Sequence, residues 1–158
     1  MKKKKIIKIS LIVFVLGAII AGSVAYYLYN KPHRDIQATK ADYQVEASKL
    51  VEEYLSDPDK ANKKYLGLGG ESKVLEVSGT VASISEDFNN QKVVLLKSAS
   101  DKAGVKCTFL ESNDSKVDDA MEGKEIIVKG VIRSGASYDE DFEMYEHVIL
   151  EKCALIEK

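Results

Sequence analysis

The sequence predicts a mainly β protein: a five-stranded barrel preceded by an amphipathic helix and by an N-terminal transmembrane helix. Three observations support this prediction. Residues 9–30 carry no charge, apolar residues then recur at helical spacing, and after Gly70 the spacing changes to strand-like alternation. The chain has 158 residues, 45% of them hydrophobic and 30% charged. That length gives room for one ordinary domain, and the apolar content excludes a wholly disordered chain.

Charge is distributed unevenly along the chain. The formal net charge is -2, but the first eight residues hold five lysines and no acid. The remaining 18 basic residues face 25 acidic ones, so residues 31–158 carry a net charge of -7. Such an acidic body disfavours a general affinity for the phosphates of nucleic acids.

Residues 1–30 are predicted to form a cytoplasmic lysine cluster followed by a membrane anchor. As a helix rising about 1.5 Å per residue, the uncharged run would span roughly 33 Å, enough for a hydrocarbon core of about 30 Å. Three tyrosines lie near its far end, where aromatic rings favour the membrane–water interface. Because positive charge resists translocation, we expect a single-pass protein with a cytoplasmic N-terminus. Its C-terminal domain would lie outside the cytoplasm, in the periplasm or at the cell surface.

A secretory signal peptide is the alternative interpretation of the same segment. The apolar part of such a signal is usually about 7–15 residues long, shorter than this run. Ser23-Val24-Ala25 nevertheless resembles a cleavage site, and cleavage there would release a secreted protein. A lipoprotein is excluded, because no cysteine precedes Cys107 to accept the lipid.

Two further segments precede the predicted barrel. Residues 31–40 are short and polar and are expected to be a linker. Residues 41–66 are expected to be helical, because apolar residues recur at helical spacing from 43 to 54. Pro58 should end this first helix, and a short second helical turn is expected over residues 59–65.

Residues 71–158 are predicted to form the barrel, because five separate runs indicate strands, three of them with side chains that alternate between two faces. The runs are residues 75–81, 93–96, 105–109, 126–133 and 147–156, with a short helical segment over 115–121. Three strands, a short helix and two more strands form the order of an OB-fold barrel, whose closure removes exposed sheet edges. An open antiparallel sheet covered by the first helix, or a small sandwich, is the alternative.

Several short motifs follow one another in this half of the chain. They are Ala61-Asn62 with Tyr65, Val77-Ser78-Gly79-Thr80-Val81, Val105-Lys106-Cys107-Thr108-Phe109, Glu122-Gly123-Lys124 with Val128-Lys129-Gly130, and Val148-Ile149-Leu150-Glu151-Lys152-Cys153. Together, over about residues 54–156, they resemble the tRNA-anticodon-binding-like OB-fold family, a set of bacterial proteins that often carry an N-terminal anchor or signal. The resemblance implies an OB-fold and brings no catalytic residues with it.

The two cysteines, Cys107 and Cys153, both lie in the part expected outside the cytoplasm. The third and fifth strands of an OB barrel are neighbours, so the two residues could come within disulfide reach, roughly 5–6 Å between Cα atoms. An oxidising compartment would preserve such a bond, and we expect it to form. Two buried free thiols are the alternative. Two thiols without a nearby histidine leave a zinc site incomplete, so no metal site and no cofactor is predicted.

The segment 138–146 joins the fourth and fifth predicted strands, where OB-folds commonly contact ligands. It contains five acids, no base and three aromatic residues: Tyr138, Phe142 and Tyr145. The rings could stack on a base, a sugar or a peptide side chain. The acids disfavour a nucleic-acid backbone and favour a protein or peptide with a basic surface. A solvated loop in which Phe142 and Tyr145 cover the barrel is the alternative.

No catalytic constellation is visible in the sequence. His33 and His147 are far apart, and no spacing places a nucleophile beside His147. The sequence therefore favours a non-catalytic OB-fold binding module, tethered to the membrane outside the cytoplasm, with an unidentified ligand or protein partner. A nucleic-acid-binding OB-fold protein is the alternative, but it would need a basic stripe with interleaved aromatic residues.

Overall fold

The structure, a computed structural model, describes residues 2–29, 36, 38–67, 72–110 and 116–156. It divides into two compact units, residues 1–34 and 35–158. The first unit contains helix α1 (Lys2–Tyr29), which begins before the uncharged run does. Among the described residues, no helix is both long enough and apolar enough to cross a membrane. The membrane-spanning role of residues 9–30 stays a prediction.

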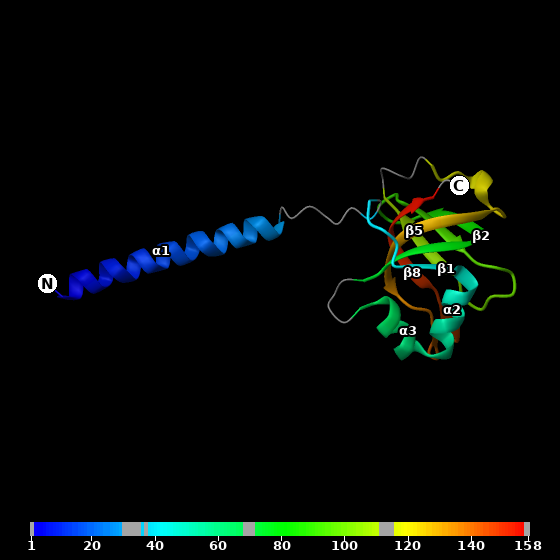
Figure 1. Ribbon diagram of the computed structural model, residues 1–158, viewed down its shortest axis with the longest axis horizontal. Helices are drawn as coiled ribbons and strands as arrows, with labels where there is room; N and C mark the ends of the chain where they lie inside the picture. The colour runs from blue at the N-terminus through cyan, green and yellow to red at the C-terminus, as the bar shows by residue number, and fades with distance from the viewer. Residues whose placement is uncertain (1, 30–35, 37, 68–71, 111–115, 157–158) are drawn as a thin grey trace. The chain divides into compact units, whose positions relative to one another are not determined.

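Five strands of the second unit close into a barrel (Figure 1). They are β2 (Val74–Glu86), β3 (Lys92–Leu96), β4 (Val105–Phe109), β5 (Glu125–Ser134) and β8 (Val148–Leu155). The neighbours run β2-β3-β4-β8-β5, and β2 also pairs with β5, which completes the ring. The β4–β8 pair is parallel and the other four pairs are antiparallel. The predicted closed barrel and its strand order are therefore confirmed, in preference to an open sheet or a sandwich.

Strand β2 is long enough to pair with both of its barrel neighbours. Residues 74–80 pair with β5, and residues 81–86 pair with β3, with a register shift between Val81 and Ser83. Gly79 lies just before this change of partner. A Cβ atom at Gly79 would lie 3.0 Å from the Cβ of Ala47 and 3.2 Å from the Cβ of Leu96. The missing side chain therefore lets the helix that begins at Ala47 approach the barrel wall.

Residues 43–46 form a strand and not the predicted first turn of a helix. Strand β1 (Tyr43–Glu46) pairs in parallel with β2, with Tyr43 opposite Leu75. Asp42 secures the start of this pair: its backbone N–H donates to the carbonyl of Val74, and its carboxylate accepts from the N–H of Val74, each at 2.8 Å. The helical prediction fails here because pairing with a distant strand outweighs local apolar spacing.

Two short helices follow β1 and pack against the barrel. They are α2 (Ala47–Ser56) and α3 (Pro58–Tyr65). Asp57 separates them, and its carboxylate accepts from the backbone N–H of Lys60 at 3.0 Å, while Pro58 occupies the first turn. The end of the first helix before Pro58 and the second helix after it are as predicted.

The buried faces of α2 and α3 join the hydrophobic core of the barrel. The helix residues in this core are Ala47, Leu50, Val51, Tyr54, Ala61 and Tyr65. Burying one large apolar side chain contributes about 1.5–3 kcal/mol, so these helices stabilise the barrel. The ring of Tyr54 lies against Gly135, where an added Cβ atom would be only 2.0 Å from the ring. Within the described part of the chain, the buried hydroxyl of Tyr54 has no hydrogen-bond partner.

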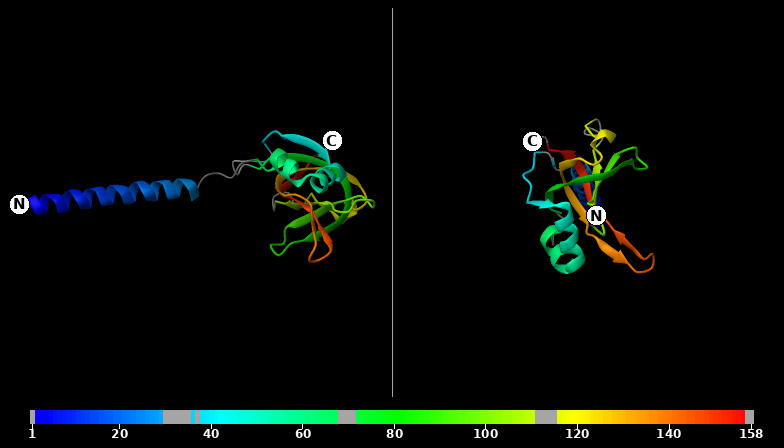
Figure 2. Two further views of the ribbon diagram at one scale, coloured as in Figure 1. Left: turned by 90° about the horizontal axis from the view of Figure 1, so that it is seen from below. Right: turned by 90° about the vertical axis from the view of Figure 1, so that its right-hand side faces the viewer.

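Two connections differ from the sequence prediction. Instead of a helical segment over 115–121, the structure has a short 3₁₀ turn, η1 (Asp119–Met121), and residue 115 lies outside the described residues. The predicted loop before the last strand is a hairpin of β6 (Ser137–Asp139) and β7 (Met144–Glu146). In both views of Figure 2 this hairpin, drawn in orange, projects from the barrel away from α2 and α3.

Candidate ligand-binding surface

The β6–β7 hairpin brings two of the three predicted aromatic residues together. Tyr138 lies opposite Tyr145 in the register, and their ring centroids are 4.8 Å apart with a tilt of 52° between the ring planes. Cross-strand aromatic pairs of this kind stabilise a hairpin by about 0.5–1.5 kcal/mol. Ser137 donates a hydrogen bond to the carboxylate of Glu146 at the open end of the same pair of strands. The hairpin is thus held by its own side chains.

The turn of the hairpin is ordered by Asp139. Its carboxylate accepts from the backbone N–H groups of Asp141 and Phe142, at 2.9 and 3.1 Å. Glu143 takes a left-handed conformation, with φ 52°. This turn leaves Phe142 with 76% of its surface exposed. The alternative interpretation, in which Phe142 covers the barrel, is therefore wrong for this residue. We call Glu140, Asp141, Phe142 and Glu143 the hairpin tip.

Residues of β4 and of the loop that joins β3 to β4 lie at the other end of the hairpin. The ammonium group of Lys102 lies 5.5 Å from the centroid of the Tyr145 ring, at cation–π distance. The backbone N–H of Gly104 donates to Nδ1 of His147 at 3.0 Å, which ties the loop between β3 and β4 to the start of β8. Burial, and after it the charges of Lys97 and Lys106, lower the pKa of His147.

We call Lys97, Lys102, Lys106, Tyr145 and His147 the hairpin base. Within the part of the chain that the structure describes, none of these three lysines forms an ion pair. The surface therefore has an acidic aromatic tip and a basic aromatic base. The sequence alone does not indicate the base, because its lysines precede the hairpin by about 30 to 40 residues in the chain and only strand order brings them there.

The loop that carries Lys102 is held to helix α2. Ser48 donates to the carboxylate of Asp101 at 2.7 Å, and the same carboxylate accepts from the backbone N–H of Ser98 at 2.9 Å. The loop is thus fixed at both ends, by α2 and by His147. A ligand at the hairpin base would meet a surface that is already ordered.

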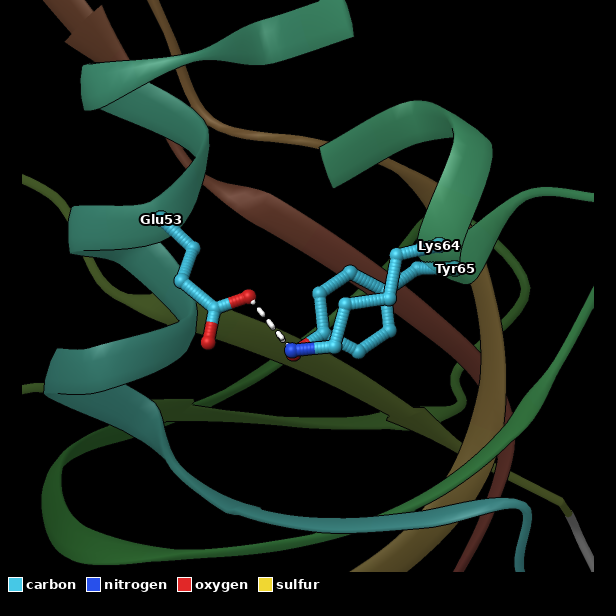
Figure 3. A network of polar contacts seen from close by, with 3 residues as sticks. All are labelled: Glu53, Lys64 and Tyr65. Atoms are coloured by element: carbon cyan, nitrogen blue, oxygen red, sulfur yellow. Dashed lines mark hydrogen bonds and ion pairs between the residues drawn. The ribbon is translucent and has the colours of Figure 1, made fainter. Parts of the chain in front are cut away.

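A second polar cluster, also missed from the sequence, joins α2 to α3 (Figure 3). Lys64 and Glu53 form an ion pair of 2.7 Å, and the hydroxyl of Tyr65 donates to the same Glu53 oxygen at 3.0 Å. The ammonium of Lys64 also lies 4.6 Å from the centroid of the Tyr65 ring. The hydrogen bond from Lys64 is the main cause of the lowered pKa of Glu53.

This cluster lies between two shallow clefts of about 400 and 340 Å³. Its charged groups are already paired with one another, so little is left to bind a ligand. We therefore assign it the role of fastening α3 to α2.

The predicted cysteine pair lies elsewhere, in the barrel core. Cys107 is in β4 and Cys153 in β8, and both are buried free thiols in this structure. The expected disulfide is thus not formed here, and it stays a prediction. Among the described residues, no group of three or more histidine, cysteine or acidic side chains is placed to hold a metal ion.

The closed five-stranded barrel, with an aromatic hairpin between its fourth and fifth strands, defines an OB-fold-like binding domain. Comparison with known families agrees: the tRNA_anti-like family model matches residues 1–141. Because this match covers most of the sequence, the chain belongs to the tRNA_anti-like family, and the resemblance seen in the sequence is confirmed. No curated protein matches the chain.

Proposed function

We propose that this protein is a non-catalytic binding module that recognises a basic peptide, or a basic patch on a protein, through the tip of its β6–β7 hairpin. The observation that carries this proposal is the exposure of Phe142 among three acids, Glu140, Asp141 and Glu143. Among the described residues, none pairs with these three carboxylates. Their charge would attract lysine or arginine, and the ring would pack against the alkyl stem or the guanidinium plane.

The order within the hairpin supports the same proposal. The Tyr138–Tyr145 pair and the two hydrogen bonds to Asp139 hold the tip in one conformation before any partner arrives. A preordered surface loses less conformational entropy on binding.

A fluorescent oligolysine peptide tests this proposal by anisotropy, with the full chain in a neutral detergent at physiological salt. The variant Phe142→Ala should weaken binding by about tenfold, as removal of a central aromatic contact typically does. The matched control is Phe88→Ala, because Phe88 is the other exposed phenylalanine of the barrel unit and lies in the β2–β3 turn. Equal oligolysine binding by the native chain and by Phe142→Ala would contradict the proposal.

We propose further that the module lies outside the cytoplasm, tethered by residues 9–30. The five lysines that precede this run and the absence of charge within it support this orientation. Large apolar side chains exposed along α1, such as Phe14, Ile19 and Ile20, favour contact with a non-aqueous phase. Protease added to spheroplasts that express the full chain should degrade the barrel, whereas a barrel that stays intact would overturn the proposed orientation.

The same preparation tests the alternative of a secreted protein. The intact mass of the membrane-associated chain should retain residues 1–30. A shorter chain in the medium, beginning near Ala25, would show instead that the segment is a cleaved signal.

Nucleic-acid binding is the second candidate function, and the hairpin base is the observation that favours it. Lys102 and Lys106 offer phosphate contacts beside a ring that can stack on a base. The net charge of -7 over residues 31–158 opposes it. An oligothymidine probe separates the two candidate functions. A nucleic-acid-binding protein would bind the probe at physiological salt. This binding would be lost in Lys102→Ala and Lys106→Ala but kept in Phe142→Ala.

A further inference from the structure

Cys107 and Cys153 lie beside each other in the barrel core. They belong to the neighbouring parallel strands β4 and β8, where Cys107 lies opposite Leu150 and Phe109 lies opposite Cys153. Neither side chain is exposed to solvent. Burial and then contact with Cys107 raise the pKa of the Cys153 thiol. The two sulfur atoms therefore share one apolar compartment.

A break in the alternation of β8 turns Cys153 toward the core. Val148 and Leu150 are buried, so simple alternation would bury Lys152 next. Lys152 instead takes a left-handed conformation, with φ 55°, which is uncommon for a residue other than glycine. The register shifts here against both β4 and β5, as at a β-bulge. The extra residue leaves Lys152 partly exposed and buries Cys153 in its place.

The neighbouring strand leaves space for the sulfur of Cys153. A Cβ atom at Gly130 in β5 would lie only 2.6 Å from that sulfur. Two separate features, the bulge at Lys152 and the missing side chain at Gly130, thus position one thiol near the other. Both are locally unfavourable, and a cysteine that served only as a small apolar residue would require neither.

We propose that Cys107 and Cys153 form a disulfide that locks the parallel β4–β8 seam of the barrel, and that the structure holds its reduced form. The reaction requires an external disulfide, on a small molecule or a protein. One thiolate attacks it to give a mixed disulfide and release a thiolate. The second cysteine then attacks the bonded sulfur and releases the other thiolate. The two cysteines lose two electrons and two protons, and the external disulfide becomes two thiols.

Burial determines when this reaction takes place. Because neither sulfur is accessible in the closed barrel, exchange must precede closure, and the finished bond is then shielded from reductant. This inference rests on the proposed extracytoplasmic location in one respect: an oxidising compartment supplies the external disulfide. The juxtaposition of the two thiols does not depend on that location.

Mass spectrometry of the full chain tests the bond. Protein extracted from its native membrane is denatured and alkylated, with or without prior reduction. We expect no alkylated cysteine without reduction and two after it. We also expect reductant to open the bond in denaturant but not in native buffer. Reduction should lower the thermal midpoint by about 10 °C, because the bond closes a loop of roughly 45 residues. Cys107→Ala and Cys153→Ala should each abolish this dependence on reductant.

Refolding the reduced chain with oxidised glutathione separates this proposal from the proposed location. If the intramolecular bond forms and raises the thermal midpoint while the extracted protein carries two free thiols, the disulfide inference holds and the location fails. If refolding gives no such bond, or gives one that lowers the thermal midpoint, the disulfide inference is overturned wherever the protein resides.

Discussion

His147 accepts a hydrogen bond from Gly104 across the base of the β6–β7 hairpin, with 3.0 Å between Nδ1 and the backbone nitrogen. The neighbouring N–H of Val148 donates to the carbonyl of the same glycine, also at 3.0 Å. Two consecutive residues of the chain thus hold both polar groups of Gly104. The loop between β3 and β4 cannot move independently of the hairpin while these bonds persist.

This relationship predicts a loss of stability in mild acid. A protonated imidazole cannot accept the Gly104 hydrogen bond, and burial with Lys97 and Lys106 lowers the pKa of His147 below 6.5. The unfolded chain therefore takes up a proton first, so stability is complete above about pH 6.5 and falls as the pH drops toward the lowered pKa. We expect a loss of about 1 kcal/mol in urea unfolding. His147→Asn keeps an acceptor that does not titrate, and its stability should not fall over this interval; an equal fall would contradict the prediction.

The lowered pKa of Glu53 predicts a second pH dependence of the free energy of unfolding, at lower pH. Lys64 and Tyr65 lower the pKa of Glu53 from 4.5, so its contribution is present above that pH and disappears as the carboxylate is protonated. Because the pair is partly exposed, Glu53→Gln should destabilise the domain by at most about 1 kcal/mol at pH 7. Chemical denaturation at pH 7 and pH 3 measures the difference, which should be smaller at the lower pH. Glu52→Gln, on the exposed side of α2, is the control and should have no effect at either pH.

Substitution of Asp139 is expected to loosen the turn of the β6–β7 hairpin locally. Asp139→Ala removes the acceptor for the N–H groups of Asp141 and Phe142, so these two amides should exchange with solvent faster. The global free energy of unfolding should change by less than about 1 kcal/mol, because the tip lies outside the core. Hydrogen exchange followed by NMR measures both quantities. Asp139→Asn keeps one side-chain acceptor and should preserve more of the protection than alanine does.

Substitution of Gly135 is expected to lower the stability of the whole domain. An alanine there would place its Cβ atom 2.0 Å from the ring of Tyr54, so Gly135→Ala should cost about 1–3 kcal/mol or more through overpacking. The double variant Gly135→Ala, Tyr54→Leu removes the ring that clashes. It should be more stable than the two single effects together predict, as measured by thermal unfolding. Strict additivity would show that the two positions are not in contact.

The barrel could be predicted from the sequence because its strands carry local signals, either alternation, as in β2, or a short apolar run, as in β3. Leu75, Val77 and Val81 indicate β2 without reference to any other segment. Strand β1 could not be predicted in this way. Tyr43 fits the helical spacing of Ala47 and Leu50 and also alternates with Val45, and only pairing with β2 decides between the two patterns.

The candidate site was predictable in part for the same reason. The aromatic acidic segment is contiguous in the chain, so the sequence alone indicates Tyr138, Phe142 and Tyr145. It does not indicate the lysines of the hairpin base. Lys97 and Lys106 lie near His147 only because β3 pairs with β4 and β4 pairs with β8. The placement of both cysteines on neighbouring strands was predictable from strand order, whereas the bulge at Lys152 that directs Cys153 inward has no local signal.

The phenol of Tyr54 sets an alkaline limit on the fold. Burial, with Tyr65 and Glu53 nearby, raises its pKa from 10.0 to about 12. Between these two values the unfolded chain loses the phenolic proton while the folded barrel retains it, so the domain should weaken steadily in strong base. Tyr54→Phe has no proton to lose and leaves no hydroxyl without a partner. It should both raise the thermal midpoint at neutral pH and extend the folded range upward.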